Sequence, residues 1–291
     1  MSLAVAILLS LKVSIGLAAF SLGLNAPLRK ALFLFRRPDD LANALVSMYV
    51  VMPAVAVAAA LMFDLPTVVK VALVACSISP IPPILPSKAI KAGEDDSYAI
   101  GLLVAGSVLS IVLVPLALEL FQVIFDMPLQ MTPTMVGAIV LETVLVPLAA
   151  GIAVRFVAPW FALRAAGPIA TLASTLLVFA LIPVLLSRSG ELVSLMGGDA
   201  LTALALFAGA GLVVGHALGG PNNADRRVLA LYSSARHPGI AVAIAQADFP
   251  DQQLVLSAVL LAMLVSALVA LPYASWARRH KTSGVPSATK G

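Results

Sequence analysis

Five ionisable side chains lie within long apolar stretches of this sequence: Lys12, Lys88, Glu142, Arg236 and His237. A fixed cation such as a guanidinium group can bind an anion, whereas a carboxyl or imidazole group can take up and release protons. Arg236 has apolar runs on both sides. Lys88 is close to Lys91 and to the end of its own stretch, so its stem could also carry the amine to a membrane surface. We expect Arg236 to bind an anion, with Lys88 as a second counter-charge.

Hydroxyl groups precede both of these cations, and we expect them to be hydrogen-bond partners of the same anion. They are Ser77 and Ser79 before Lys88, and Tyr232, Ser233 and Ser234 before Arg236. Glu142 is the one carboxylate well inside a predicted span. Glu142 could be a proton carrier or the partner of one of these cations. It could equally be half of a buried ion pair with a purely structural role. His237 is a further candidate for binding the anion; it could also carry protons or simply pack within a bundle. We expect Lys12 to be a packing or interface residue.

The composition places these residues in a membrane. Of the 291 residues, 61% are hydrophobic and 11% are charged, and the mean hydropathy is +1.05. Several apolar stretches exceed the roughly 20 residues that cross a bilayer as a helix. This balance excludes a cytosolic enzyme and a nucleic-acid-binding protein, since the net charge of +4 lies in short loops. The single cysteine, Cys76, excludes a disulfide scaffold.

Hydropathy and turn residues predict an all-α polytopic protein with about nine membrane spans. The predicted spans are 3–24, 41–62, 67–92, 98–121, 134–157, 168–187, 200–218, 228–247 and 254–277. The basic residues gather in the loops after the first, fifth and seventh spans and after the last span, for example at Arg29, Arg37, Arg227 and Arg279. The positive-inside rule then puts the N-terminus outside and the C-terminus in the cytoplasm, in the cell (inner) membrane.

Two of these spans are interrupted by residues that cannot continue a regular helix. The first interruption contains Pro80, Pro82, Pro83 and Pro86, and the second contains Pro238 and Gly239. The two positions correspond if residues 1–121 and 134–277 are inverted repeats, the first lacking one helix, with 278–291 as a cytoplasmic tail. Backbone groups freed inside a bilayer need protein or water as partners. We therefore expect two discontinuous helices that cross at a polar centre.

Several motifs resemble the bile acid:sodium symporter family. They are Phe20 to Leu24 before a basic loop, Val51-Met52-Pro53, Val144 to Gly151, Pro238 to Ala245, and a last helix that ends with Ala274 to Arg279. The resemblance spans nearly the whole chain. It implies nine or ten helices in inverted repeats, two discontinuous helices that cross near the midplane, and secondary transport.

The sodium sites of that family are not retained in this sequence. Members that bind sodium carry a Gly-Gly-Thr-Ala-Ser-Asn-like stretch at the first crossover, where this chain has Pro80 to Leu85. At the second crossover a Glu followed by Gln-Asn is replaced by a segment with Tyr232, Arg236 and His237. The oxygen ligands that a hard cation needs are missing from the matched positions. The resemblance therefore predicts the fold and transport, but not sodium binding.

Together these features predict a secondary transporter of a small organic anion that works by alternating access without sodium, with Glu142 or His237 as a possible proton carrier. A sodium-coupled symporter of organic anions or bile acids is an alternative. Others are a membrane receptor or regulatory protein that binds a ligand without flux, and a membrane enzyme with Lys88 as nucleophile. No motif for a cofactor, a metal or hydrolytic chemistry is present, so we expect neither a cofactor nor enzymatic activity. The substrate and the oligomeric state stay open.

Overall fold

The computed structural model of the chain describes residues 3–83, 96–125, 132–237, 241–242 and 254–279, and all regular structure in these ranges is helical. Six helices are long and apolar enough to cross a membrane: Pro38–Met62, Ser97–Ile124, Thr134–Val157, Pro159–Ser187, Gly198–Leu218 and Val255–Ala277. Each overlaps one predicted span. The other three predicted spans fall on α1 and on the two interrupted segments.

The first part of the chain forms α1 (Leu3–Asn25), α2 (Leu28–Ala31), the 3-10 turn η1 (Leu34–Arg36), α3 (Pro38–Leu45), the π-helical turn η2 (Val46–Val51), α4 (Met52–Met62), α5 (Thr67–Ile78) and α7 (Asp96–Phe125). The second part forms α8 (Pro133–Val140), the π-helical turn η3 (Leu141–Leu145), α9 (Val146–Val157), α10 (Pro159–Ser187), α11 (Ser189–Leu195), α12 (Gly198–Leu218), α13 (Asn223–Ser234) and α15 (Val255–Arg279). Because no break separates α3, η2 and α4, or α8, η3 and α9, each group is one continuous helix.

Helix α10 begins nearer the N-terminus than the predicted span 168–187. It starts at Pro159, where a missing backbone N–H costs nothing at the first helical position. Arg164 therefore lies within the helix rather than in a loop, and its guanidinium carbon is 4.2 Å from the centre of the Trp160 ring. This cation–π contact stabilises a charged residue in the first turns of α10, which the hydropathy pattern left outside the predicted span.

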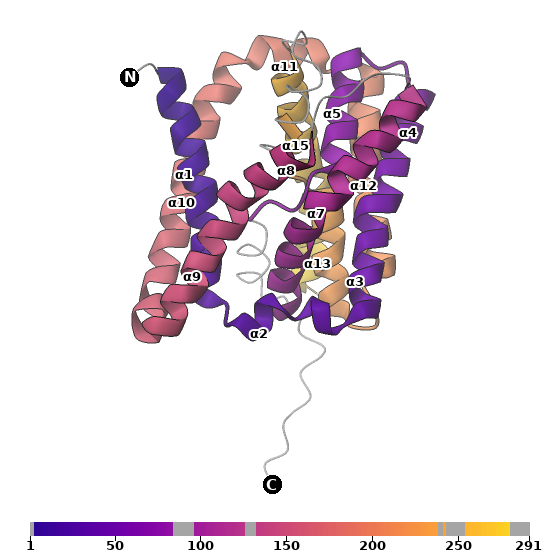
Figure 1. Cartoon of the computed structure of the whole chain (residues 1–291). Helices are drawn as coiled ribbons and strands as arrows, with labels where there is room; N and C mark the ends of the chain where they lie inside the picture. Colours follow the sequence, from indigo (N-terminus) through magenta and orange to yellow (C-terminus); the bar gives the residue numbers. More distant parts are fainter. Residues whose placement is uncertain (1–2, 84–95, 126–131, 238–240, 243–253, 280–291) are drawn as a thin grey trace.

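The helices form two groups (Figure 1). Helices α1, α9 and α10 contact one another, and we call them the three-helix bundle. Helices α4, α5, α7, α12, α13 and α15 form the main bundle. Because α8 contacts α7 and α9 contacts α1, the continuous helix α8–η3–α9 passes from the main bundle to the three-helix bundle. The two bundles do not coincide with the two predicted repeats, since α1 of the first repeat packs with α9 and α10 of the second.

Glycines bring helices close together within both bundles. A Cβ atom on Gly23 of α1 would lie 2.8 Å from the Gly151 Cα atom of α9. On α12, a Cβ on Gly211 would lie 2.7 Å from the backbone nitrogen of Ser234, at the end of α13. Such close backbone contact is the usual way in which membrane helices pack without a hydrophobic driving force. The second contact lies at the C-terminal end of α13.

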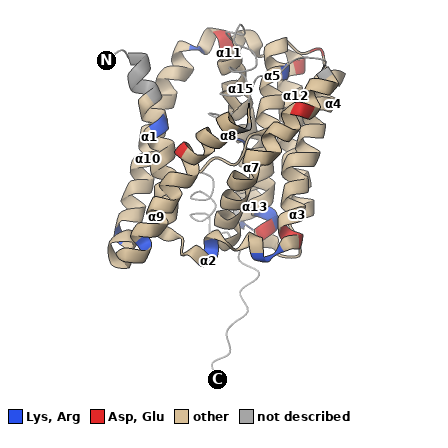
Figure 2. Cartoon of the chain, in the orientation of Figure 1, with Lys and Arg blue, Asp and Glu red and all other residues tan. Residues whose placement is uncertain are grey.

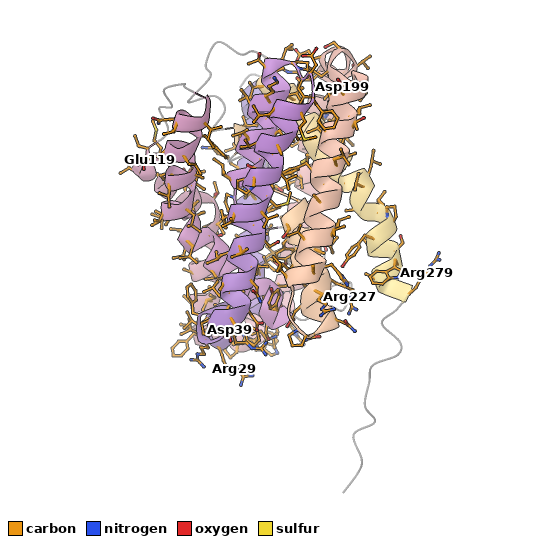
Figure 3. The ribbon with its side chains drawn as sticks, turned by 90° about the vertical axis from the view of Figure 1, so that its right-hand side faces the viewer. Arg29, Asp39, Glu119, Asp199, Arg227 and Arg279 are labelled. Atoms are coloured by element: carbon orange, nitrogen blue, oxygen red, sulfur yellow. The ribbon has the colours of Figure 1, made fainter. Side chains whose placement is uncertain are left out.

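The charged side chains lie mainly at the two ends of the molecule (Figure 2). Arg29, Asp39, Arg227 and Arg279 are toward one end of the molecule, whereas Asp199 is at the opposite end (Figure 3). The lengths of helix between these ends are mostly apolar, as a membrane-spanning fold requires.

Candidate functional site

Helices α5 and α13 both end in the interior of the main bundle. Helix α5 ends at Ile78, and Ser79 is extended because the residue before a proline avoids the helical conformation. Helix α13 ends at Ser234, and Ala235 is extended. The backbone N–H of His237 donates a hydrogen bond of 2.9 Å to the carbonyl oxygen of Pro80. The two interrupted segments therefore contact each other directly, and we call this place the crossing.

Arg236 lies at the crossing and is 7% exposed. Its Nη2 atom donates to the Met48 carbonyl oxygen at 2.8 Å, and its Nη1 atom makes a longer contact of 3.4 Å with the Ser79 carbonyl oxygen. Among the described residues, Nε has no hydrogen-bond partner and no carboxylate pairs with the guanidinium. Two neutral carbonyls compensate a buried cation only in part.

The Met48 carbonyl oxygen is available because the helix around it is irregular. In a regular α-helix it would accept a hydrogen bond from the N–H of Met52, but in the π-helical turn that N–H donates to Ser47 instead. The next residue, Pro53, has no N–H to offer. The Val51-Met52-Pro53 motif thus leaves one carbonyl inside the main bundle for Arg236.

The predicted hydroxyl partners have different surroundings. The Ser233 hydroxyl shares a hydrogen bond of 2.7 Å with the Ser47 hydroxyl of η2, next to the carbonyl that binds Arg236. The hydroxyls of Ser77 and Ser79 donate to carbonyl oxygens of their own helix, at 2.7 and 3.0 Å. Ser234 is buried, and its hydroxyl has no hydrogen-bond partner among the described residues.

Tyr232 is fully buried and packs in the same core cluster as Tyr98 of α7. Its hydroxyl likewise finds no hydrogen-bond partner in the part of the chain that the structure describes. His237 is 1% exposed and lies at the crossing through its backbone bond to Pro80. Ile81 and Pro83 continue the first interrupted segment and are buried, with Pro82 half-buried between them. Four predicted site residues lie outside the described residues: Pro86, Lys88, Pro238 and Gly239.

Glu142 has a partner that sequence reasoning missed. Its Oε1 atom is 3.8 Å from the Nζ atom of Lys12, and both side chains are largely exposed. The sequence left Glu142 open as a proton carrier, as the partner of a cation or as part of a buried pair, and Lys12 was expected to be a packing or interface residue. The signal for it was the opposite charge of two residues that each lie within an apolar stretch.

Sequence reasoning also missed Ser47 and Met48, which carry two of the hydrogen bonds around the crossing. The signal for them was Pro53, a proline within a predicted span. Among the described residues, no group of three or more His, Cys, Asp or Glu side chains could hold a metal ion.

Comparison with known families shows that residues 12–194 fit the model of the Sodium Bile acid symporter family. The match covers more than half of the chain. It includes the interruption after α5 and ends within α11, before α13 and Arg236. No curated protein matches the chain.

Proposed function

The chain belongs to the Sodium Bile acid symporter family, and we propose that it carries a small organic anion across the membrane as a secondary transporter. The family and the apolar helices establish an integral membrane protein of a transporter family. The organic anion, its independence of sodium and the mode of transport are our proposals.

One observation supports an anionic substrate above all: the guanidinium of Arg236 is buried at the crossing, and its described hydrogen bonds go only to carbonyl oxygens. Moving a charge from water into a protein interior costs roughly several kcal/mol of free energy unless a partner compensates the charge. A carboxylate or sulfonate group of the substrate would supply that partner. Ser233 and Ser234 are close in sequence and could add hydrogen bonds to the same group. Lys88 remains the proposed second counter-charge.

The surroundings of the crossing also support transport without sodium. A sodium site needs several oxygen ligands that converge on one point. The permanent charge of Arg236 would repel a sodium ion nearby. We therefore propose that this fixed charge takes the place of the coupling cation.

Alternating access is the cycle that the two bundles favour. The three-helix bundle and the main bundle are joined by the continuous helix α8–η3–α9 (Figure 1). We propose that the bundles rock against each other so that the crossing opens to one side of the membrane at a time. The N-terminus would be outside and the C-terminus in the cytoplasm of a cell (inner) membrane.

Uptake into liposomes tests this function. The purified protein is reconstituted, and entry of radiolabelled pyruvate, succinate and taurocholate is measured with either sodium or potassium outside. We expect uptake of at least one anion at the same rate in both salts. Arg236→Met should reduce this rate by about tenfold or more, because a charged hydrogen bond is lost. Arg227→Met, a change near the outer end of α13, the helix that precedes Arg236, is the control.

Each alternative has its own outcome. Undiminished uptake by Arg236→Met would refute the role of Arg236. Strong stimulation by sodium would favour the sodium-coupled symporter, and saturable binding without entry would favour the receptor.

A further inference from the structure

Three aromatic rings form a cluster where α12 and α15 end, and we call it the ring cluster. The Nδ1 atom of His216 and the hydroxyl of Tyr273 share a hydrogen bond of 2.7 Å. The centroid of the Trp276 ring is 5.8 Å from that of His216 and 5.6 Å from that of Tyr273. His216 and Tyr273 are half-buried, whereas Trp276 is 44% exposed. The cluster is therefore held together across two helices, with Trp276 accessible from outside.

The ring cluster lies at the level of a membrane surface. The two membrane-spanning helices that contain it end at Leu218 and Ala277, within one helical turn of His216 and Trp276. Tyrosine and tryptophan are common at this level, because each has an apolar ring and a polar O–H or N–H group. The phosphates of lipid headgroups lie at the same level. A bilayer component that contacts the ring cluster would therefore do so with its headgroup region.

Two arginines flank the ring cluster from different helices. Arg279 follows it on α15, one turn after the last ring. Arg226 lies in the first turns of α13, where its backbone packs directly against Gly219, the residue that caps α12. The Arg226 Nε atom donates a hydrogen bond of 2.6 Å to the Gly220 carbonyl oxygen, which holds the side chain beside the end of α12. The charge of Arg226 also acts on the His216 ring.

The acidic residues of these helices lie away from the ring cluster. Helices α12, α13 and α15 contain two of them, Asp199 and Asp225. Asp199 is at the opposite end of the molecule from Arg279 (Figure 3). Asp225 is 4% exposed, and its Oδ2 atom is 3.9 Å from the Nη1 atom of Arg37, so its charge is balanced on the side of α3. The surface beside the ring cluster is therefore positive and complementary to an anion.

Apolar surface continues from the ring cluster toward the middle of the membrane. Leu268 and Leu271 of α15 are 64% and 57% exposed, and Val213 of α12 is 71% exposed. Exposed apolar side chains on membrane-spanning helices contact acyl chains. A free phosphate ion would use the arginines but not this surface, whereas a phospholipid would use both. The arrangement therefore fits a lipid better than a soluble anion.

We propose that the ring cluster and its two arginines bind the headgroup of an anionic phospholipid. Arg226 and Arg279 donate hydrogen bonds to the phosphate oxygens, and Trp276 packs against the glycerol and the start of the acyl chains. A zwitterionic lipid fits less well, because it brings a cation of its own close to the arginines. Basic residues between membrane helices bind anionic headgroups in this way. The site lies at the other end of α13 from the crossing and does not depend on what the protein carries.

The fluorescence of Trp276 tests this contact directly. The chain has two tryptophans, and Trp160→Phe leaves Trp276 as the single one. This protein is placed in phosphatidylcholine bilayers that contain rising fractions of either phosphatidylglycerol or phosphatidylcholine brominated near the headgroup. Bromine quenches a tryptophan that it contacts. We expect brominated phosphatidylglycerol to reach half-maximal quenching at about a tenfold lower fraction, since each arginine near an anionic headgroup strengthens the attraction by about fivefold.

Two double variants in the Trp160→Phe background separate a site from general attraction by positive loops. Arg226→Gln/Arg279→Gln should bring the two quenching curves together, because the preference for the anionic lipid is lost. Arg29→Gln/Arg36→Gln removes two exposed arginines from α2 and η1 and should keep the original difference between the curves. Native mass spectrometry of the wild type should show retained phosphatidylglycerol that the first double variant loses.

Three outcomes would overturn the inference. The first is equal quenching of Trp276 by both brominated lipids, which needs no arginine variant and so decides even if a double variant fails to fold. The second is an equal loss of the lipid preference in both double variants, which would assign it to the positive charge of this end as a whole. The third is full reversal of the quenching by inorganic phosphate, which would identify a phosphate-ion site in place of a lipid site.

Discussion

Arg236 combines a cost to the folded protein with a role in the proposed site. Its charge is buried, and its described partners are the neutral carbonyls of Met48 and Ser79. Replacing a poorly compensated charge with an apolar side chain of similar volume is often neutral or stabilising. A residue that binds substrate can therefore contribute little to the stability of the folded protein when no substrate is bound.

We predict that Arg236→Met unfolds within a few degrees of the wild-type temperature when no anion is present. A bound anion should raise the unfolding temperature of the wild type, because it binds only the folded state. The variant should lose that rise. Thermal unfolding with and without the transported anion measures both effects. A strongly destabilised variant would show that Arg236 is mainly structural.

Glu191 provides a second prediction at the scale of single residues. Hydrogen bonds from the Ser257 hydroxyl and from Arg188 lower the pKa of the Glu191 carboxyl below its usual value. Because the folded pKa is depressed, this stabilisation is present above the pKa of the unfolded chain, about 4.3, and is lost as pH falls through the folded pKa.

The unfolding temperature of the wild type should therefore fall more steeply below about pH 4 than that of Glu191→Gln. Ser257→Ala should weaken the pH dependence. Asp199→Asn, an exposed acidic position in the first turn of α12, is the control. Parallel curves for wild type and Glu191→Gln would contradict the role of this hydrogen bond.

Among the elements, α12 offers a matched pair of glycines. A Cβ on Gly211 would meet Ser233 and Ser234 at 2.7 Å, whereas a Cβ on Gly209 has no atom within 4 Å. Gly211→Ala should push α13 away and destabilise the protein by about 1–3 kcal/mol. Gly209→Ala should stabilise it by about 0.5–1 kcal/mol, because alanine favours the helix. Equal effects in denaturant unfolding would refute the close contact.

Pro53 tests the irregular turn in η2. In Pro53→Ala a new N–H becomes available to the preceding helical turn, where it can compete with Arg236 for the Met48 carbonyl. We expect the variant to be at least as stable as the wild type but to take up the anion about tenfold more slowly, through loss of a charge-assisted hydrogen bond. Circular dichroism and liposome uptake measure the two properties. Wild-type uptake would show that the Met48 contact is dispensable.

The sequence predicts the interruptions better than it predicts what surrounds them. Pro80, Pro82 and Pro83 follow one another too closely for a regular helix to continue, so the end of α5 follows from local chemistry. The contact between His237 and Pro80 depends on the path of both chains, and the resemblance to a family suggested it. The partners of Arg236 and Glu142 depend on how neighbouring helices are rotated. An apolar pattern around the whole helix does not specify that rotation.

At the scale of the whole molecule, the distribution of charge predicts how the protein lies in the membrane. Arg29 and Asp199 are exposed at opposite ends (Figure 3). The chain has one cysteine, Cys76, and it is buried. New cysteines at the two ends can therefore be labelled separately in a Cys76→Ala background.

We expect an impermeant maleimide to label Asp199→Cys on intact cells and Arg29→Cys only after the membrane is opened. The Cys76→Ala chain without a new cysteine should stay unlabelled. The reverse pattern would invert the proposed orientation, and labelling of both sites on intact cells would contradict their separation by the bilayer.

The guanidinium at the crossing also makes the membrane voltage a participant in the proposed cycle. If the main bundle moves while Arg236 is unoccupied, a positive charge moves through part of the electric field, worth up to about 2.3 kcal/mol per 100 mV for a complete passage. A negative interior would then draw the empty carrier toward its inward-facing form. A monovalent anion on Arg236 cancels that charge and makes the loaded step indifferent to voltage. The membrane voltage would therefore change the rate at which the empty carrier returns, but not the rate at which the loaded carrier crosses.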